Sequence, residues 1–281
     1  MSEPFAISAP AKTNIRLRVL GKREDGFHEI DTRMAPLTLA DHLTLQWTSD
    51  DRVELSCSDP SLPTGEDNLV VKAVRALERR VSRRLSVRIH LEKHIPHGAG
   101  LGGGSSDAAS TLTALNRMGS FGLSRNELIE MAAEIGSDVP FFIHRRACDC
   151  RGRGEILEPL ETSPPRLPVF LAKPNFGISA AWAYRNYASS SDYPDAPDFV
   201  QSCSWGEVVN DLERPVFEKY LVLADLKHWL LRREEVHAAI LSGSGSAMLV
   251  ILRRNDLGSV LRDKIHAHYG ENWWTWTGYT A

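Results

Sequence analysis

A glycine-rich segment between a predicted strand and a predicted helix places the strongest constraint on how this chain folds. Residues 97–110 read HGAGLGGGSSDAAS, after an alternating strand pattern and before a helical one. Glycine has no Cβ, so backbone N–H groups approach a ligand closely, and a helix start adds unpaired N–H donors with partial positive charge. The segment therefore predicts an anion site suited to phosphate groups. The hydroxyls of Ser105 and Ser106 are candidates to bond phosphate or to place Mg²⁺.

Other interpretations of this segment fit less well. Gly98, Gly100 and Gly103 match the spacing of a dinucleotide fingerprint. However, a helical pattern near Ser124 stands where that fold needs a second strand with an acidic end. Walker and protein-kinase motifs are absent from the sequence. A mobile glycine linker is the remaining alternative, and the clean strand and helix patterns on either side argue against it.

Apolar periodicity predicts a chain that mixes strands and helices. Alternation or short apolar runs predict strands at 14–20, 42–47, 53–57, 85–91, 247–252 and 273–279. Helical spacing predicts helices at 68–81, 106–118, from 124 onward, and near 215–232 and 256–268. Asn68 is a suitable N-cap for the first helix, and Ser124 with Glu127 forms a capping box for the third.

Composition bounds the class of protein. The chain has 281 residues, of which 42% are apolar and 25% charged, as in globular proteins, and its net charge is −3. Bulk charge therefore predicts no nucleic-acid or membrane partner, and the arginines of 75–84 are read as a solvated helix face. No secretory signal is visible, and the longest apolar run, 247–252, is too short to cross a membrane. With only four cysteines, these points predict a cytoplasmic protein.

The chain also shows signs of internal division. Residues 161–168, ETSPPRLP, contain three prolines and predict a linker, so we place a domain boundary between 161 and 162. Residues 188–198, ASSSDYPDAPD, predict a long surface loop.

Three further segments carry polar residues in suggestive places. Lys12 stands beside Asn14 at a strand start, and Asp138 follows a predicted helix that Pro140 is expected to stop. Residues 242–246, SGSGS, precede an apolar strand. Alone, each has an ordinary reading: a solvated lysine, a turn aspartate and a tight turn. Their meaning depends on the segments being taken together.

Taken together, the segments PAKTN, GLGGGSSDAA, GSDVP and LSGSG occur in the order seen in small-molecule kinases of the GHMP superfamily. The chain resembles that superfamily from about residue 9 to about residue 252. Residues 21–30, GKREDGFHEI, resemble the Asp-Gly-Tyr-His segment of its 4-diphosphocytidyl-2-C-methyl-D-erythritol kinase branch. Phe27 replaces the usual Tyr, which keeps ring stacking but removes the phenol hydroxyl.

The resemblance implies an α+β fold of two domains. Residues 1–161 would form an N-terminal domain of the ribosomal-protein-S5 type, and residues 162–281 a ferredoxin-like C-terminal domain, with the active site in the cleft between them. It also implies a reaction in non-mevalonate isoprenoid biosynthesis. ATP would be the co-substrate, Mg²⁺ the metal, and the C2 hydroxyl of the cytidyl-bearing methylerythritol compound the acceptor.

The resemblance further implies roles for individual residues. Lys12 and Asp138 match the catalytic pair. The ATP phosphate loop matches His97, Gly98, Ala99, Gly100, Leu101, Gly102, Gly103, Gly104, Ser105 and Ser106, with Ser106 as the candidate Mg²⁺ ligand. The acceptor site matches Asn14, Phe27, His28, Tyr184, Gly243 and Gly245. Trp182 is the alternative to Tyr184 as the second ring that would stack on cytosine.

Two rival functions stay open on the sequence alone. Another GHMP kinase, acting on homoserine or mevalonate, would have an acceptor without a nucleobase, and residues 25–28, DGFH, argue against it. A non-catalytic sensor on the same fold would bind ATP without turnover. The presence of Lys12, Asp138 and all three glycine segments argues against that reading.

Overall fold

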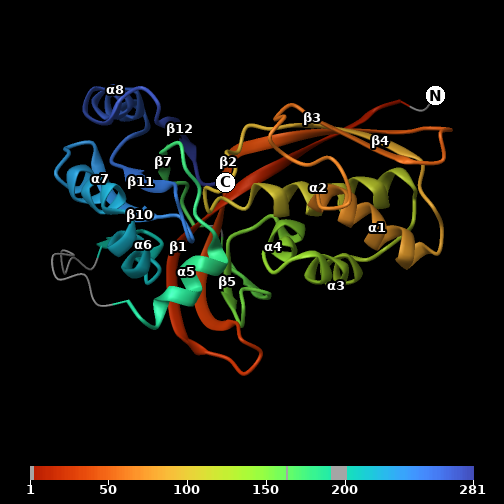
Figure 1. Cartoon of the computed structure of the whole chain (residues 1–281), viewed down its shortest axis with the longest axis horizontal. Coiled ribbons are helices and arrows are strands. Elements are labelled where there is room, and N and C mark those ends of the chain that lie inside the picture. The colour runs from red at the N-terminus through yellow and green to blue at the C-terminus, as the bar shows by residue number, and fades with distance from the viewer. Residues whose placement is uncertain (1–2, 163, 191–200) are drawn as a thin grey trace. The chain divides into compact units, whose positions relative to one another are not determined.

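The structure is a computed structural model that describes residues 3–162, 164–190 and 201–281. Its strands are β1 (Phe5–Lys22), β2 (His28–Trp47), β3 (Val53–Cys57), β4 (Val87–Glu92), β5 (Cys148–Arg151), β6 (Ile156–Pro159), β7 (Pro168–Lys173), β8 (Gln201–Cys203), β9 (Gly206–Asn210), β10 (Val236–Leu241), β11 (Met248–Leu252) and β12 (Trp274–Tyr279). Its helices are α1 (Leu69–Val81), α2 (Gly103–Met118), α3 (Arg125–Ile135), α4 (Val139–His144), α5 (Ala180–Tyr187), α6 (Glu213–Lys219), α7 (Leu221–Leu231) and α8 (Gly258–Tyr269), with a 3₁₀ turn at Asn255–Leu257 (Figure 1).

The chain forms two compact units that are each discontinuous in sequence. The first contains residues up to Ala11, Leu39–Pro96 and Gly102–Arg146, and the second contains Lys12–Thr38, His97–Leu101 and Ala147 onward. The long strands β1 and β2 therefore contribute to both units. The predicted division at 161/162 is a different, sequence-contiguous one, and it stays a prediction.

The first unit combines a strand layer with helices α1–α4. Its strands follow the order β3-β4-β2-β1, and β2 pairs antiparallel with β4 so that Leu43 faces Leu91 and Leu45 faces Ile89. All four of these side chains are buried, as the predicted alternation requires. Helices α1 and α2 run along one side of β3 and β4 (Figure 1), and the four helices pack on one another.

Two helix starts confirm the predicted caps. The Asn68 side chain accepts a hydrogen bond from the Val70 backbone N–H at 2.9 Å, directly before α1. Ser124 and Glu127 form both hydrogen bonds of the capping box before α3. α2 begins at Gly103, earlier than the predicted 106, so the glycine run itself contributes the first helical turn.

The predicted role of Pro140 is wrong. α3 already ends at Ile135, and the Gly136 N–H bonds back to the Ala132 carbonyl. Pro140 lies in the first turn of a new helix, α4, where proline is tolerated because its missing N–H would have no intrahelical partner. Asp138 directly precedes that helix, at its N-cap position.

The second unit contains an antiparallel sheet in the order β10-β11-β7-β12. The predicted strands at 247–252 and 273–279 are confirmed as β11 and β12, which flank β7. In the same unit β9 pairs parallel with β1, and β5 pairs antiparallel with β2. The apolar core includes the buried side chains Leu17, Phe170, Leu226, Leu241, Val250 and Leu261.

The predicted single helix near 215–232 is two helices, α6 and α7. The chain turns at Tyr220, whose φ of −111° and ψ of 70° are not helical. The Tyr220 ring stacks on Phe176 at 5.3 Å and meets Trp182 edge-on at 5.7 Å. Contacts with residues far away in the sequence do not change the spacing of apolar residues along a helix. The spacing within 215–232 therefore gives no sign of the break at Tyr220.

Strand β5 contains the run Cys148-Asp149-Cys150, in which buried and partly exposed side chains alternate. Cys148 and Cys150 are buried, whereas Asp149 between them points to the other face, as strand alternation requires. The Asp149 carboxylate accepts two hydrogen bonds from Arg33, at 2.8 and 2.7 Å. Those bonds hold the pKa of Asp149 below its usual value.

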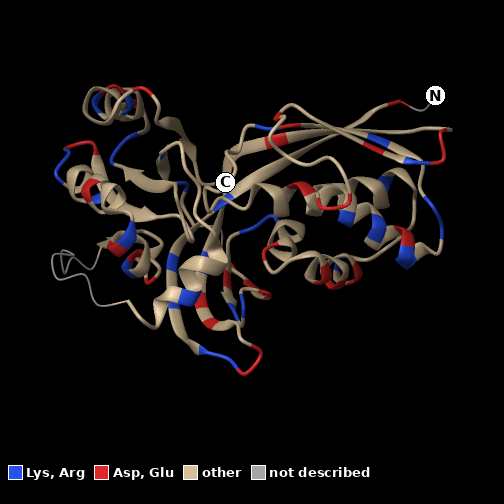
Figure 2. Ribbon diagram, in the orientation of Figure 1, with Lys and Arg blue, Asp and Glu red and all other residues tan. Residues whose placement is uncertain are grey.

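The arginine-rich stretch around α1 has acidic residues near it in space (Figure 2). Arg75 pairs with Glu66 and Glu78, and Arg80 pairs with Glu127. This is the pattern expected of a solvated face, where exposed pairs stabilise by about 0–1 kcal/mol each. Most of the predicted loop at 188–198 lies outside the described residues. None of the helices in the described ranges has both the length and the apolar character needed to cross a bilayer.

Candidate active site

Lys12 and Asn14 form the centre of a buried polar chain in the second unit. Both side chains lie on the same face of β1, because residues two apart on a strand point the same way. The Lys12 ammonium donates to the Asn14 Oδ1 at 2.8 Å, and the Asn14 amide donates to the Thr32 hydroxyl on β2, also at 2.8 Å. Thr32 was not predicted as a site residue. These two hydrogen bonds together fix the direction of the Lys12 ammonium.

The glycine turn at 242–246 packs directly against this pair. Gly243 has φ +55°, and a Cβ there would lie 3.3 Å from the Asn14 Oδ1 and 3.4 Å from the Lys12 Nζ. The hydroxyls of Thr13 and Ser242 are within hydrogen-bond distance of each other, at 3.2 Å. The structure therefore brings together Lys12, Asn14 and Gly243, three residues that sequence analysis singled out separately.

The first part of the glycine-rich segment, His97–Leu101, belongs to the same cluster. The Gly98 carbonyl accepts from the backbone N–H groups of Ser246 and Ile178, at 3.1 and 3.3 Å. The Lys12 N–H donates to the Leu101 carbonyl at 2.9 Å. Gly100, at φ +74°, approaches the Ser242 carbonyl so closely that no side chain fits between them. The glycine segment, the glycine turn and Lys12 are thus one bonded assembly.

The second part of the segment, from Gly102 onward, belongs to the first unit and starts α2. Gly102 has φ +69° and supplies no side-chain cap, so no N-cap side chain competes with a ligand for the N–H groups of the first turn. The Ser106 Oγ is buried and finds no hydrogen-bond partner in the described part of the chain. A buried hydroxyl without a partner is unfavourable by about 1–3 kcal/mol, which indicates a place where a ligand oxygen or cation fits.

A buried ionic cluster that the sequence analysis missed lies at the start of α2. The Lys93 ammonium, which follows β4, pairs with Asp41 on β2 and with Asp107 on α2, the latter at 2.9 Å. A Cβ on Gly103 would lie 3.1 Å from the Lys93 Nζ. The only sequence signals were a charged residue inside an otherwise apolar strand pattern and one in a small-residue helix. The cluster joins both strands to the first turns of the helix.

Burial dominates the protonation of this cluster. It raises the pKa of the Asp107 carboxyl to about 7; the Lys93 ammonium opposes that shift and the Asp41 carboxylate adds to it. Burial works against the Lys93 ammonium, but its two carboxylate partners raise its pKa overall. Burial is also the main reason that the pKa of the nearby Cys57 thiol is raised. The charge of Asp107 adds a small part to that shift.

Stability should therefore depend on pH through Asp107. Folded Asp107 holds its proton more tightly than the unfolded chain does, so its contribution to the free energy of unfolding is complete below about pH 4 and falls until about pH 7. Between pH 5 and 7 the expected loss is about 2–3 kcal/mol. Asp107→Asn cannot ionise, so urea unfolding at these two pH values should show a smaller decline than in the wild type. Equal declines would show that Asp107 titrates near its usual value.

Asp138 lies in the first unit, half-buried at the junction of α3 and α4. The junction is short, and the Val139 N–H closes it by donating to the Gly136 carbonyl at 3.1 Å. The Asp138 carboxylate is therefore attached to a backbone that is held between two helices. Its pairing with Lys12, which belongs to the second unit, stays a prediction.

An aromatic pair stands at the predicted base-binding position of the second unit. The His28 and Tyr184 rings are stacked, with centroids 5.5 Å apart and planes 27° from parallel. Burial, helped by the nearby Lys22 charge, lowers the pKa of His28, so the imidazole is neutral at pH 7 and offers one donor and one acceptor. Phe27 is half exposed, and the Arg153 guanidinium lies 4.8 Å from its ring centre.

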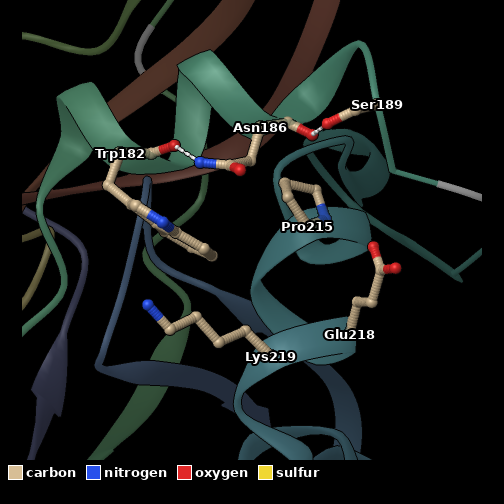
Figure 3. A pocket seen from close by; sticks show the side chains of 6 residues that line it. All are labelled: Trp182, Asn186, Ser189, Pro215, Glu218 and Lys219. Carbon is tan, nitrogen blue, oxygen red and sulfur yellow. Dashed lines mark hydrogen bonds between the residues drawn. The ribbon is translucent and has the colours of Figure 1, made fainter.

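Trp182 lies on a different side of α5 from Tyr184, since residues two apart on a helix point about 200° apart. It lines a pocket of about 230 Å³ together with Lys219, and the Lys219 ammonium lies 4.4 Å from its ring centre (Figure 3). The other lining residues are Asn186, Ser189, Pro215 and Glu218. Of the two candidate rings, Tyr184 is the one that faces His28.

Comparisons with known proteins find relatives that match most of this chain. Residues 68–146 match the family described as GHMP kinases N terminal domain. The 4-diphosphocytidyl-2-C-methyl-D-erythritol kinase of Methylacidiphilum infernorum is 38% identical over 88% of this chain and 86% of its own length. The enzyme of the same name from Syntrophotalea carbinolica is 37% identical over 93% and 94%. A crystal structure titled 4-(cytidine 5'-diphospho)-2C-methyl-D-erythritol kinase has a TM-score of 0.80 and 32% identity, covering 98% of both chains.

Proposed function

This chain belongs to the 4-diphosphocytidyl-2-C-methyl-D-erythritol kinase family within the GHMP kinases, and we propose that it transfers the γ-phosphoryl group of ATP to the C2 hydroxyl of that cytidyl compound. The observation that carries the proposal is the similarity over most of the chain to kinases of that name. The reaction would supply a phosphorylated intermediate for isoprenoid biosynthesis.

The chemistry assigns Lys12 and Asp138 to the acceptor hydroxyl. The hydroxyl oxygen forms a bond to the γ-phosphorus, the bond from that phosphorus to the ADP oxygen breaks, and the hydroxyl proton passes to the Asp138 carboxylate. The Lys12 ammonium, directed by Asn14, stabilises the negative charge that grows on the attacking oxygen. A positioned general base contributes about 10²–10⁴-fold in rate.

The phosphate groups of ATP are assigned to residues 97–106. Backbone N–H groups of the glycine segment and of the first turn of α2 are suited to bind phosphate oxygens. The buried, unpartnered Ser106 hydroxyl has the oxygen chemistry that Mg²⁺ prefers, so the residues present fit that ion. When bound, Mg²⁺ would neutralise charge on the phosphates.

The cytidyl group is assigned to Phe27, His28 and Tyr184. Aromatic faces suit a planar base, and a neutral imidazole pairs with its donor and acceptor groups. Gly243 and Gly245 would border the acceptor beside Asn14. Binding energy at such a remote group would help orient the reacting hydroxyl. The description of the two domains as S5-like and ferredoxin-like also stays a proposal.

A direct assay tests the function. The protein is incubated with Mg-ATP and either the cytidyl methylerythritol compound, homoserine or mevalonate, and products are identified by mass spectrometry and ³¹P NMR. We expect a new phosphomonoester only with the cytidyl compound. Phosphorylation of homoserine or mevalonate would support the other GHMP kinases, and tight ATP binding without turnover of any acceptor would support the sensor.

Phe27→Ala tests the base site. Loss of the exposed ring should raise the KM for the cytidyl compound by about 10–30-fold while the KM for ATP changes less than about 3-fold, because ring stacking acts on one substrate only. Steady-state kinetics with each substrate varied measures both. Leu20→Ala, on the neighbouring strand and 64% exposed, is the matched control. Equal changes in the two KM values would remove Phe27 from the base site.

A further inference from the structure

At the junction of β9 and α6, three polar side chains hydrogen-bond to backbone groups of other elements. They are Asn210, Asp211 and Glu213. Asp211 accepts from the Val19 N–H on β1 at 2.8 Å and pairs with Arg18. Glu213 accepts from the Leu241 N–H, at the end of β10, at 2.9 Å. Asn210 bonds to the same end of β10 and to the glycine turn that follows it. No role has been assigned above to this segment, which we call the 210–213 clamp.

Asn210 is the member of the clamp whose chemistry is most constrained. It is 3% exposed, and its amide nitrogen donates to two carbonyl oxygens, of Leu241 at 2.8 Å and of Gly243 at 2.7 Å. Its Oδ1 accepts from the Leu212 N–H at 2.9 Å. Two carbonyl acceptors require a group with two N–H donors, so a carboxylate of the same shape would instead face two oxygens.

The residue that Asn210 holds is the one that packs on the catalytic lysine. Gly243 lies so close to Lys12 and Asn14 that a Cβ would come within 3.4 Å of the Nζ and 3.3 Å of the Oδ1. The same Cβ would lie 3.3 Å from the Gly100 carbonyl of the glycine-rich segment. The position of the Gly243 backbone therefore sets the space around the Lys12 ammonium.

We propose that Asn210 is a positioning residue for phosphoryl transfer, acting through Gly243 to hold Lys12 and Asn14 in their reactive arrangement. The proposal rests on the proposed function, because it assumes that Lys12 acts on the acceptor hydroxyl. Asn210 itself touches neither Lys12 nor a reacting atom in this account. Because Asn210 bonds to the glycine turn and not to residues 97–106, its effect should fall more on the rate of the chemical step than on the binding of ATP.

Asn210→Asp tests this proposal against a matched control. Gln201 on β8 uses the same carboxamide chemistry, donating to the Ala239 carbonyl at 3.0 Å and accepting from the Ala239 N–H at 2.8 Å, but Ala239 lies within β10 and is not part of the glycine turn. Asn210→Asp should lower kcat by about 30–100-fold with the KM for ATP within about 3-fold of wild type, because small misplacements of reacting groups have effects of that size. Gln201→Glu should leave kcat within about 2-fold.

Thermal unfolding and NMR separate positioning from general stability. In Asn210→Asp the side-chain amide signals of Asn14 and the backbone amide signal of Gly243 should shift, whereas in Gln201→Glu they should stay in place at a comparable loss in Tm. If Asn210→Asp does not fold, Asn210→Ser keeps one donor and should give about a 5–10-fold loss in kcat.

Two results would overturn the inference: a kcat that falls equally in the Asn210 and Gln201 variants, or Asn14 and Gly243 signals that do not move in the Asn210 variant. A wild-type protein that phosphorylates no acceptor would instead overturn the proposed function. In that case the NMR comparison still decides whether Asn210 positions the glycine turn.

Discussion

Asp138→Asn is expected to lower kcat by about 10²–10⁴-fold while leaving ATP binding intact. Asparagine has nearly the shape of aspartate, so the junction between α3 and α4 should keep its backbone. The amide oxygen cannot take up the proton that the acceptor hydroxyl must lose when it attacks the γ-phosphorus. The loss should therefore appear in the chemical step, which single-turnover rapid quench measures directly.

Control measurements distinguish loss of the base from loss of charge or of structure. Asp256→Asn removes the same charge at an exposed position paired with Arg254 and should leave kcat unchanged. Titration with a non-hydrolysable ATP analogue should give dissociation constants within about 3-fold for wild type and Asp138→Asn. A near-normal kcat in Asp138→Asn would reject Asp138 as the base, and a parallel loss of nucleotide binding would assign it to the ATP site.

Sequence pattern predicted the local structure of several elements that bury one face. The alternation at 85–91 and the helical spacing at 68–81 each correspond to a real element, and Asn68 caps the helix as expected. Local rules succeed there because burial and capping act within a few residues. They failed at Pro140, which lies in the first turn of a helix instead of ending one, and at Tyr220, where the backbone leaves the helical conformation between α6 and α7.

Residues of the candidate site could be predicted where they belong to a short sequence motif. They could not be predicted where their role depends on contacts with residues far away in the sequence. Lys12, Asn14 and Gly243 were singled out from local sequence, and the structure joins them. By contrast, Asn210 bonds to a carbonyl 33 residues away, and Asp41 pairs with a lysine 52 residues away. The local sequence does not say which partner such a residue has, because a polar residue in or at the end of a strand looks the same whichever distant group it contacts.

The same distinction applies to glycines. In the sequence, Gly98, Gly100 and Gly102 look equivalent, and all three have positive φ. The structure separates them by what surrounds each: Gly102 starts α2, Gly98 lies against the backbone of Gly177, and Gly100 lies against that of Ser242. A side chain next to a glycine can rotate away to make room for a new Cβ, but a neighbouring backbone cannot. A substitution is therefore most disruptive at a glycine that lies against backbone.

Gly100→Ala is therefore expected to lower both the stability of the protein and its affinity for ATP strongly. The new Cβ would overlap the Ser242 carbonyl oxygen and lie 3.0 Å from the Gly245 nitrogen, so either the glycine-rich segment or the glycine turn must move. The free energy of unfolding should fall by about 3–5 kcal/mol, from the strain of an alanine at positive φ plus the overlap. Because residues 97–106 would bind phosphate, affinity for ATP should fall by roughly 100-fold.

Gly122→Ala isolates the backbone part of that effect. Gly122 also has positive φ, +70°, but nothing lies within 4 Å of a Cβ placed there, so only conformational strain of about 1–2 kcal/mol should result. Urea unfolding and isothermal titration with ATP are measured on both variants. If Gly100→Ala resembles Gly122→Ala in stability and binds ATP normally, the contact between the two glycine segments has no part in holding phosphate.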